Sequence, residues 1–249
     1  ATIAGAERFR DMVEANGVDT VLTELVDTTE GGYIAGEQLA KAGIDFLFVY
    51  LHSYVSSGYW IPGIMRLYVP TVIVSLPANV DMEEAYVTGT AIRMGGACQM
   101  PETWSALKRC NREPLDMILG DPERCTEIVR EIDEWCRVAT ALAILRRSIF
   151  GYMGHSYDGM LDMNFDPTSL TGAFNGLYVR MVEMCELADY VEKADEAEVK
   201  EKLEQMRETF EFRGHSNDPI TQNASEDDIR WAARCSVGLD KLVKNNHLD

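Results

Sequence analysis

The most constraining feature of this sequence is an almost continuous apolar run that ends abruptly in polar residues. Residues 44–51 read Ile-Asp-Phe-Leu-Phe-Val-Tyr-Leu, and His52-Ser53-Tyr54 follow at once. Residues 70–76 and 115–119 are two further apolar segments, and helical patterns separate the three. Strands buried on both faces of a parallel sheet show such runs, and alternating strands and helices indicate right-handed crossovers. The sequence therefore predicts an α/β fold.

The segments around these strands carry apolar residues at helical spacing. They predict helices over residues 1–16, 31–42, 60–67, 103–110 and 122–147, the first two ended by Gly17 and Gly43. Asp121 is expected to cap the last of these helices, with Pro122 in its first turn. Residues 18–26 predict another strand, whereas glycines leave residues 79–96 ambiguous. We expect residues 1–147 to form a flavodoxin-like, doubly wound parallel sheet without its first strand, because such domains normally begin on a strand.

A second α/β region is expected over residues 148–249. Its first segment, Ser-Ile-Phe-Gly-Tyr-Met, is apolar and breaks at Gly154 into a loop rich in polar and aromatic residues. Further on, the pattern predicts a strand over 178–184 and helices over 167–174, 185–193 and 196–210. Ser225 and Asp228 form an approximate capping box that opens a final helix. The sequence stops where an α/β fold would next add a strand, so this domain is expected to be incomplete at its C-terminus.

Charge and composition exclude several classes of partner. The chain of 249 residues has a formal net charge of −18, which disfavours binding to nucleic acid and to anionic membranes. No apolar run approaches the roughly 18 residues that span a bilayer, and no signal peptide is visible. The six cysteines lack metal-ligand spacing and lie mostly in apolar helical patterns. These features predict reduced thiols in a cytoplasmic protein.

Candidate site residues lie where predicted strands end, because ligands of open α/β sheets bind beyond the carboxyl ends of the strands. His52 follows residues 44–51 and is suited to acid/base chemistry or to binding a substrate hydroxyl; alternatively it is a loop histidine that caps a helix. His155, Tyr157 and Asp158 form the densest polar cluster, although Gly154 and Gly159 equally suit a rigid turn between domains.

Other candidates have equally plain structural alternatives. Gln99 and Glu102 could lie near a polyol or belong to a turn before the next helix. Met160 more often serves packing than binding. Asp162 and Asp166 could suggest a hard-cation site, but two loop carboxylates are weak evidence, and Asp166 suits the N-cap of the helix that Pro167 begins. Dinucleotide-binding, P-loop and HExxH zinc motifs are absent from the sequence.

Three stretches resemble L-arabinose isomerases and the related L-fucose isomerases. They are Tyr50-Leu51-His52-Ser53-Tyr54 with Trp60 opening a helix, the helix through residues 135–139, and the Gly-x-x-x-x-Gly-Met turn over 154–160. The order of elements is similar along nearly the whole chain. Around Gln99, however, this sequence lacks the histidine of the arabinose isomerases, so the resemblance does not predict which sugar is bound.

The resemblance implies a metal-dependent aldose–ketose isomerase that binds a small-molecule sugar and assembles as a homo-oligomer, a trimer or hexamer. Mn²⁺ would be held by two glutamates and two histidines that lie beyond Asp249, so no catalytic or metal-ligating residue is assigned here. Met160 would line the sugar pocket, and Gln99 would lie near the active site of a neighbouring subunit. The predicted sugar-binding residues are His52, Gln99, His155, Tyr157 and Met160. A non-catalytic sugar-binding module and a pure assembly domain are the alternatives.

Overall fold

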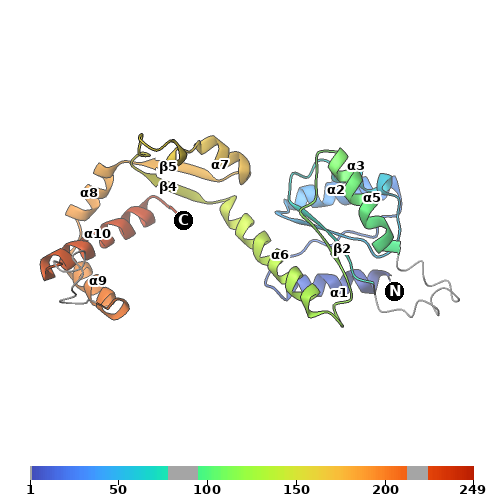
Figure 1. The fold of residues 1–249 in the computed structure, drawn as a ribbon, viewed down its shortest axis with the longest axis horizontal. Coiled ribbons are helices and arrows are strands. Elements are labelled where there is room, and N and C mark those ends of the chain that lie inside the picture. Colours follow the sequence, from blue (N-terminus) through green and yellow to red (C-terminus); the bar gives the residue numbers. More distant parts are fainter. Residues whose placement is uncertain (1, 78–94, 212–223) are drawn as a thin grey trace. The chain divides into compact units, whose positions relative to one another are not determined.

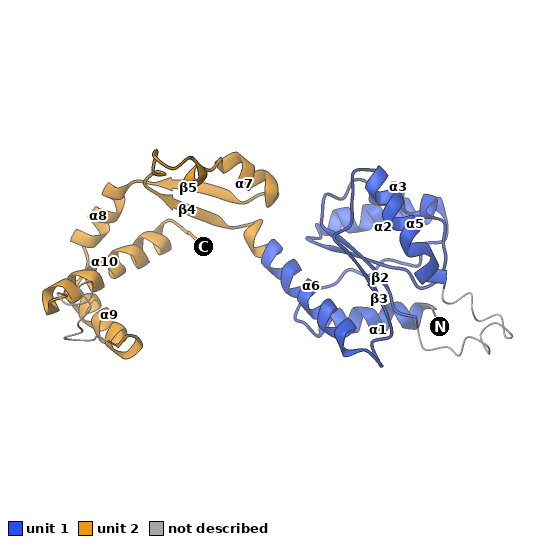
Figure 2. Cartoon of the chain, in the orientation of Figure 1, with its two compact units in different colours: residues 1–143 blue, residues 144–249 orange. Residues whose placement is uncertain are grey.

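A computed structural model describes residues 2–77, 95–211 and 224–249. Residues 78–94, which include most of the ambiguous segment 79–96, lie outside the described part. The chain divides into two compact units, residues 1–143 and 144–249 (Figure 2). None of the described helices is both long and apolar enough to cross a membrane.

A parallel sheet forms the centre of the first unit (Figure 1). Its strands β1 (Leu47–Tyr50), β2 (Thr71–Ser75) and β3 (Asp116–Leu119) lie in the order β1-β2-β3. Val49 pairs with Ile73, and Ile73 with Met117, so the strands run in register with their carboxyl ends at one edge. The prediction that residues 44–51, 70–76 and 115–119 contribute parallel strands of one sheet is confirmed.

The helices described in this unit lie within a few residues of the predicted positions, with one exception. They are α1 (Thr2–Glu14), α2 (Thr29–Ala42), the short 3₁₀ helix η1 (Ser57–Tyr59), α3 (Ile61–Ile64), α5 (Gly95–Arg109) and α6 (Thr126–Leu145), which runs across the division between the units. Gly17 and Gly43 follow α1 and α2 with φ of 76° and 66°, the left-handed conformation that glycine adopts readily.

The exception is α5, which begins at Gly95 rather than at residue 103. Gln99 and Glu102 therefore lie within a helix and not in a turn before it. Gly95, Gly96 and Pro101 disfavour a helix locally, which is why the pattern missed its first turns.

Two other predictions for this unit are wrong. Residues 18–26 form no strand and pair with no other described strand; Val21, Leu22 and Leu25 are exposed. Asp19, Thr20, Thr23 and Glu24 interrupt the apolar residues, so the segment lacks the continuous apolar run of the three paired strands. Asp121 does not cap α6, because residues 121–125 make a separate turn in which Asp121 accepts a hydrogen bond from the Glu123 amide at 3.0 Å, and the helix begins at Thr126.

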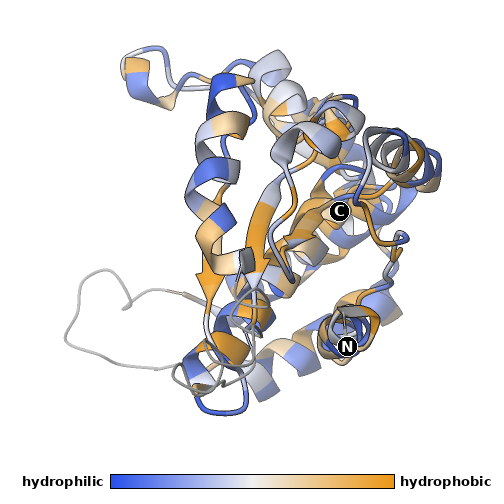
Figure 3. Cartoon of the chain, turned by 90° about the vertical axis from the view of Figure 1, so that its right-hand side faces the viewer, coloured by the Kyte–Doolittle hydropathy of each residue, from blue (hydrophilic) through white to orange (hydrophobic). Residues whose placement is uncertain are grey.

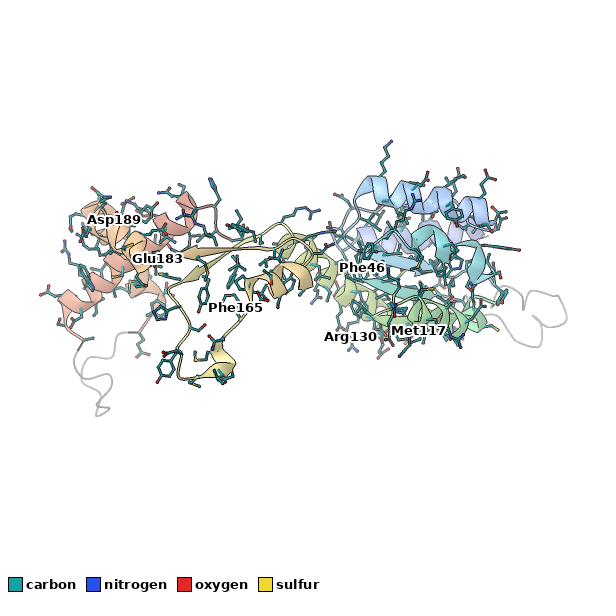
Figure 4. All side chains as sticks on the ribbon, turned by 90° about the horizontal axis from the view of Figure 1, so that it is seen from above. Phe46, Met117, Arg130, Phe165, Glu183 and Asp189 are labelled. Carbon is teal, nitrogen blue, oxygen red and sulfur yellow. The ribbon has the colours of Figure 1, made fainter. Side chains whose placement is uncertain are left out.

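Helices cover both faces of the β1–β2–β3 sheet. Neighbouring residues of a strand point to opposite faces, so Val72 and Val74 pack on one side and Ile73 on the other. The first side is covered by α1 and α6, and the second by α3 and α5. Figure 3 shows hydrophobic colouring along the strands between more mixed helices. On the α6 side, Phe46 lies 5.9 Å from the ring of Trp135 (Figure 4).

The second unit also contains parallel strands. β4 (Ile149–Met153) pairs with β5 (Tyr178–Val182), and η3 (Leu161–Met163) and α7 (Pro167–Ala173) connect them. The helices α8 (Met184–Glu192), α9 (Glu196–Thr209) and α10 (Glu226–Asn245) follow, and α9 and α10 enclose a small apolar core together with Ala194. Both predicted caps are confirmed: Asp166 accepts from the Thr168 amide at 2.9 Å, and Ser225 and Asp228 form the capping box of α10.

Candidate functional site

A cavity of about 560 Å³ opens at the carboxyl edge of the β1–β2–β3 sheet. Each strand end contributes to its wall: Tyr50 from β1, Leu76 and Pro77 after β2, and Asp121 after β3. Helix α1 forms the opposite wall with Gly5, Arg8, Phe9 and Met12 among its residues. The volume and the mixture of apolar with a few polar groups are typical of small-molecule sites.

Two polar side chains converge beside this cavity, over Gly5 of α1. A Cβ atom at Gly5 would lie 2.9 Å from His52 Nδ1 and 3.3 Å from Tyr50 Oη. Glycine at this position therefore leaves room for both groups against the helix backbone. The structure places His52 at the carboxyl edge, as predicted, and adds Tyr50, which sequence reasoning did not include among the site residues.

Tyr50 is held in a defined orientation. Its ring stacks on Phe9 of α1 with centroids 5.1 Å apart and planes 14° apart. Burial raises the pKa of the Tyr50 hydroxyl, with Arg8 opposing the shift. The phenol therefore stays protonated at neutral pH and can both donate and accept a hydrogen bond. A polar aromatic residue at the next-to-last position of the strand predicted over residues 44–51 is the sequence signal that could have pointed to it.

Gln99 lies at the same sheet edge, on the side of α5. Its side chain is fully buried, its Oε1 accepts from the Val55 amide at 2.9 Å, and its Nε2 donates to the Val55 carbonyl. Both ends of the amide are thus engaged by the loop that follows β1. A sugar contact for Gln99 stays a prediction, and in this conformation its hydrogen-bonding groups face the protein.

Glu102 lies one helical turn after Gln99 and contacts the same loop. It accepts hydrogen bonds from Ser57 Oγ at 2.6 Å and from Tyr54 Oη at 2.9 Å. The bonds from Ser57 and then Tyr54 lower the pKa of Glu102, and the bond to Glu102 raises the pKa of Tyr54. Glu102 is therefore a carboxylate at neutral pH, and its oxygens are hydrogen-bonded to Ser57 and Tyr54 of the loop.

The predicted loop of the second unit follows the carboxyl end of β4. Ser156 Oγ donates to the Met163 carbonyl at 3.0 Å and lies 2.9 Å from Tyr152 Oη. The ring of Tyr152 meets Phe165 edge-on at 4.6 Å, where the loop returns toward the sheet (Figure 4). These contacts fix the backbone of the loop without using its predicted binding residues.

The predicted binding residues of that loop lie at the surface of their unit. Tyr157 is 62% exposed and Met160 is 47% exposed. His155 is also exposed, with Nδ1 at 3.1 Å from the neighbouring Ser156 carbonyl. Sugar binding by these three residues stays a prediction. They belong to one unit and His52 and Gln99 to the other, so the structure groups the candidates as two separate sets.

Metal ligands do not gather in the described parts of the chain. Within residues 2–77, 95–211 and 224–249, no three His, Cys, Asp or Glu side chains lie close enough together to hold an ion. Asp166 is engaged as the cap of α7 rather than with Asp162. Comparison with models of known protein families and with curated proteins finds no match to this sequence.

Proposed function

We propose that this chain supplies the sugar-positioning part of a metal-dependent aldose–ketose isomerase similar to the L-arabinose and L-fucose isomerases. The observation that carries the proposal is the cavity at the carboxyl ends of β1, β2 and β3, beside which Tyr50 and His52 converge over Gly5. Carboxyl ends of parallel strands are the usual ligand side of open α/β sheets. The resemblance of residues 50–54 to the isomerases supplies the class of ligand.

The chemistry of the cavity suits a polyhydroxylated ligand. Tyr50 Oη and the imidazole of His52 offer hydrogen bonds to hydroxyl groups, and Asp121 adds a carboxylate to the wall. The partly buried ring of Tyr50 also lines the wall and offers aromatic surface on which the C–H faces of a sugar can pack. Arg8, an exposed residue of the same wall, adds positive charge.

The proposal assigns no metal and no proton transfer to this chain. The described residues offer no donor set for Mn²⁺, so the ion of the proposed enzyme does not fit here. Binding and orienting the sugar are the steps that Tyr50 and His52 would perform. The proposed assembly is a homo-oligomer, which the resemblance rather than the geometry supports.

We also propose that the first unit is a flavodoxin-like, doubly wound domain. The supporting observations are parallel strands in the order β1-β2-β3 and helices on both faces, α1 and α6 opposite α3 and α5. In such a domain the carboxyl edge is the expected ligand side, which agrees with the place of the cavity.

Calorimetric titration of the purified protein tests the sugar site. The probes are L-arabinose, L-fucose and the open-chain polyol L-arabinitol, which mimics the extended sugar that an isomerase acts upon. We expect L-arabinitol to bind, and Tyr50→Phe to weaken binding about tenfold, since losing one hydrogen bond of this kind costs roughly 1–2 kcal/mol. Tyr33→Phe, a change to an exposed tyrosine of α2 in the same unit, is the matched control and should leave affinity unchanged.

The outcomes separate the proposal from its alternative. Binding of the cyclic sugars with no binding of L-arabinitol would favour a non-catalytic sugar-binding module. Failure of all three probes at tens of millimolar, or equal affinity in Tyr50→Phe and Tyr33→Phe, would overturn the proposed site.

A further inference from the structure

The loop of residues 52–57, here named the β1 loop, is anchored where it leaves the sheet. The Leu51 amide donates to the Val74 carbonyl at 2.7 Å, and the Leu51 carbonyl accepts from Ser75 Oγ at 2.9 Å. Gly96 of α5 lies directly against the same carbonyl, since a Cβ there would be 2.0 Å from it. The start of the β1 loop is therefore fixed to β2 and to the first turn of α5.

The far end of the β1 loop is anchored by two side chains of α5. Gln99 bonds both the amide and the carbonyl of Val55. Glu102 accepts from the Ser57 amide at 3.4 Å as well as from Ser57 Oγ and Tyr54 Oη. Residues three apart lie on the same face of a helix, so the two side chains act on the loop together. Gln99 and Glu102 are named the α5 clamp.

We propose that the α5 clamp consists of positioning residues that fix the β1 loop and thereby hold His52 beside the sugar cavity. Only His52, Ser53 and Tyr54 lie between the anchors at Leu51 and Val55. A segment this short has few conformations left once its ends are fixed. The clamp thus acts on the ligand through His52, and its effect on sugar binding rests on the proposed function.

The residue type at position 99 matches this role. A glutamine side chain offers one acceptor and one donor group, which complement the N–H and C=O of a single peptide residue. Glutamate at this position would place an oxygen against the Val55 carbonyl, and methionine would bond neither group. Gln99 is fully buried and directs both ends of its amide at Val55 on the α5 side of the sheet, whereas the cavity lies on the α1 side.

Hydrogen exchange at the Val55 and Ser57 amides tests the clamp without any ligand. We expect Gln99→Met to speed hydrogen exchange at the Val55 amide by about tenfold or more. The reason is that this partly buried amide loses roughly one hydrogen bond, which lowers the free energy of local opening. Thr103→Val is the matched control, because Thr103 is equally buried on α5 and its hydroxyl has no hydrogen-bond partner within the described ranges. It should leave Val55 exchange at the parental rate.

A second variant keeps the test decisive where Gln99→Met fails to fold. Glu102→Ala removes a less buried side chain, and we expect faster exchange at Ser57 with a melting temperature close to that of the parent. Glu102→Gln, which keeps an acceptor for Ser57, should restore most of the protection. Parental exchange at Ser57 in Glu102→Ala, in a folded protein, would overturn the proposal.

Affinity for L-arabinitol links the clamp to the cavity. Glu102→Ala and any folded Gln99→Met should weaken binding about fivefold or more, although neither residue lines the cavity, whereas Thr103→Val should bind as the parent does. If the parent protein binds no sugar, the proposed function fails while the exchange experiment still decides whether the clamp orders the loop. Faster exchange together with unchanged affinity would overturn the link to His52.

Discussion

Gly36→Ala should strongly destabilise the first unit, although it adds a single methyl group. Gly36 is buried in α2, and a Cβ atom there would lie 2.0 Å from the Gly63 carbonyl oxygen of α3. The close approach of the two helices extends one turn back along α2, since a Cβ at Gly63 would lie 2.0 Å from the Gly32 carbonyl oxygen. Backbone atoms cannot rotate away as a side chain can, so the methyl group must push the two helices apart.

The cost follows from that displacement. Ordinary contact begins at 3.4 Å, so the helices must separate by about 1.4 Å, the difference between 3.4 and 2.0 Å. Overpacking of this kind costs roughly 3 kcal/mol, and the better helix propensity of alanine returns about 1 kcal/mol. A net loss of about 2 kcal/mol corresponds to a fall in melting temperature of roughly 5–10 °C for a unit of this size.

Urea unfolding followed by tryptophan fluorescence measures this loss. Trp60, Trp104 and Trp135 report on the first unit, and Trp231→Phe removes the tryptophan of the second. Gly58→Ala is the matched control, because a Cβ at Gly58 meets no described atom within 4 Å and its φ is not in the left-handed range. Equal free energies of unfolding for the two alanine variants would refute the close packing of α2 on α3.

Two further predictions concern the sheet and the α5 clamp. Leu47→Asp places a charge between Leu39 and Leu67 at a position only 9% exposed, and should cost several kcal/mol; a thermal melt within 2 °C of the parent would contradict the buried strand. Because bonds from Ser57 and Tyr54 hold the pKa of Glu102 below its ordinary 4.5, its stabilising effect is present above that pH and is lost as pH falls through the folded pKa. Unfolding free energies measured from pH 6 to pH 3 should therefore decline less steeply in Glu102→Gln than in the parent, and identical slopes would argue against the shift.

The local sequence predicted the strands well where a continuous apolar run indicated a strand buried on both faces. Residues 70–76 contain β2, the central strand, and residues 44–51 contain β1 beside it; both strands contribute residues to the apolar cores on the two faces of the sheet. The same logic failed for residues 18–26, whose valines and leucines are interrupted by Asp19, Thr20, Thr23 and Glu24 and lie mostly at the surface. Pairing is a property of the fold, and the local pattern does not contain it.

The location of the candidate site could be predicted from the sequence, but the residues that its side chains contact could not. The strand-end rule correctly placed His52 at the carboxyl edge, whereas Gln99 was expected in a turn, near a polyol or near the active site of a neighbouring subunit, and it lies in α5. The bonds between Gln99 and Val55 join residues 44 positions apart, and Gly5 meets Tyr50 and His52 from a helix at the start of the chain. Such contacts depend on how crossovers return the helices to the sheet. The sequence pattern could therefore not distinguish a sugar ligand from a clamp at position 99.

Alternation along β1 explains how one strand end serves both faces of the sheet. Tyr50 packs with α1 and α6, whereas Leu51 packs with α3 and α5. His52 returns to the side of Tyr50, with ring centroids 6.1 Å apart, and so reaches Gly5. The anchors at Leu51 and Val55 act on the α5 side and the polar groups of the cavity on the α1 side. Because a shift of one residue exchanges the two faces, holding the backbone at Leu51 and Val55 is the condition for His52 to face the cavity.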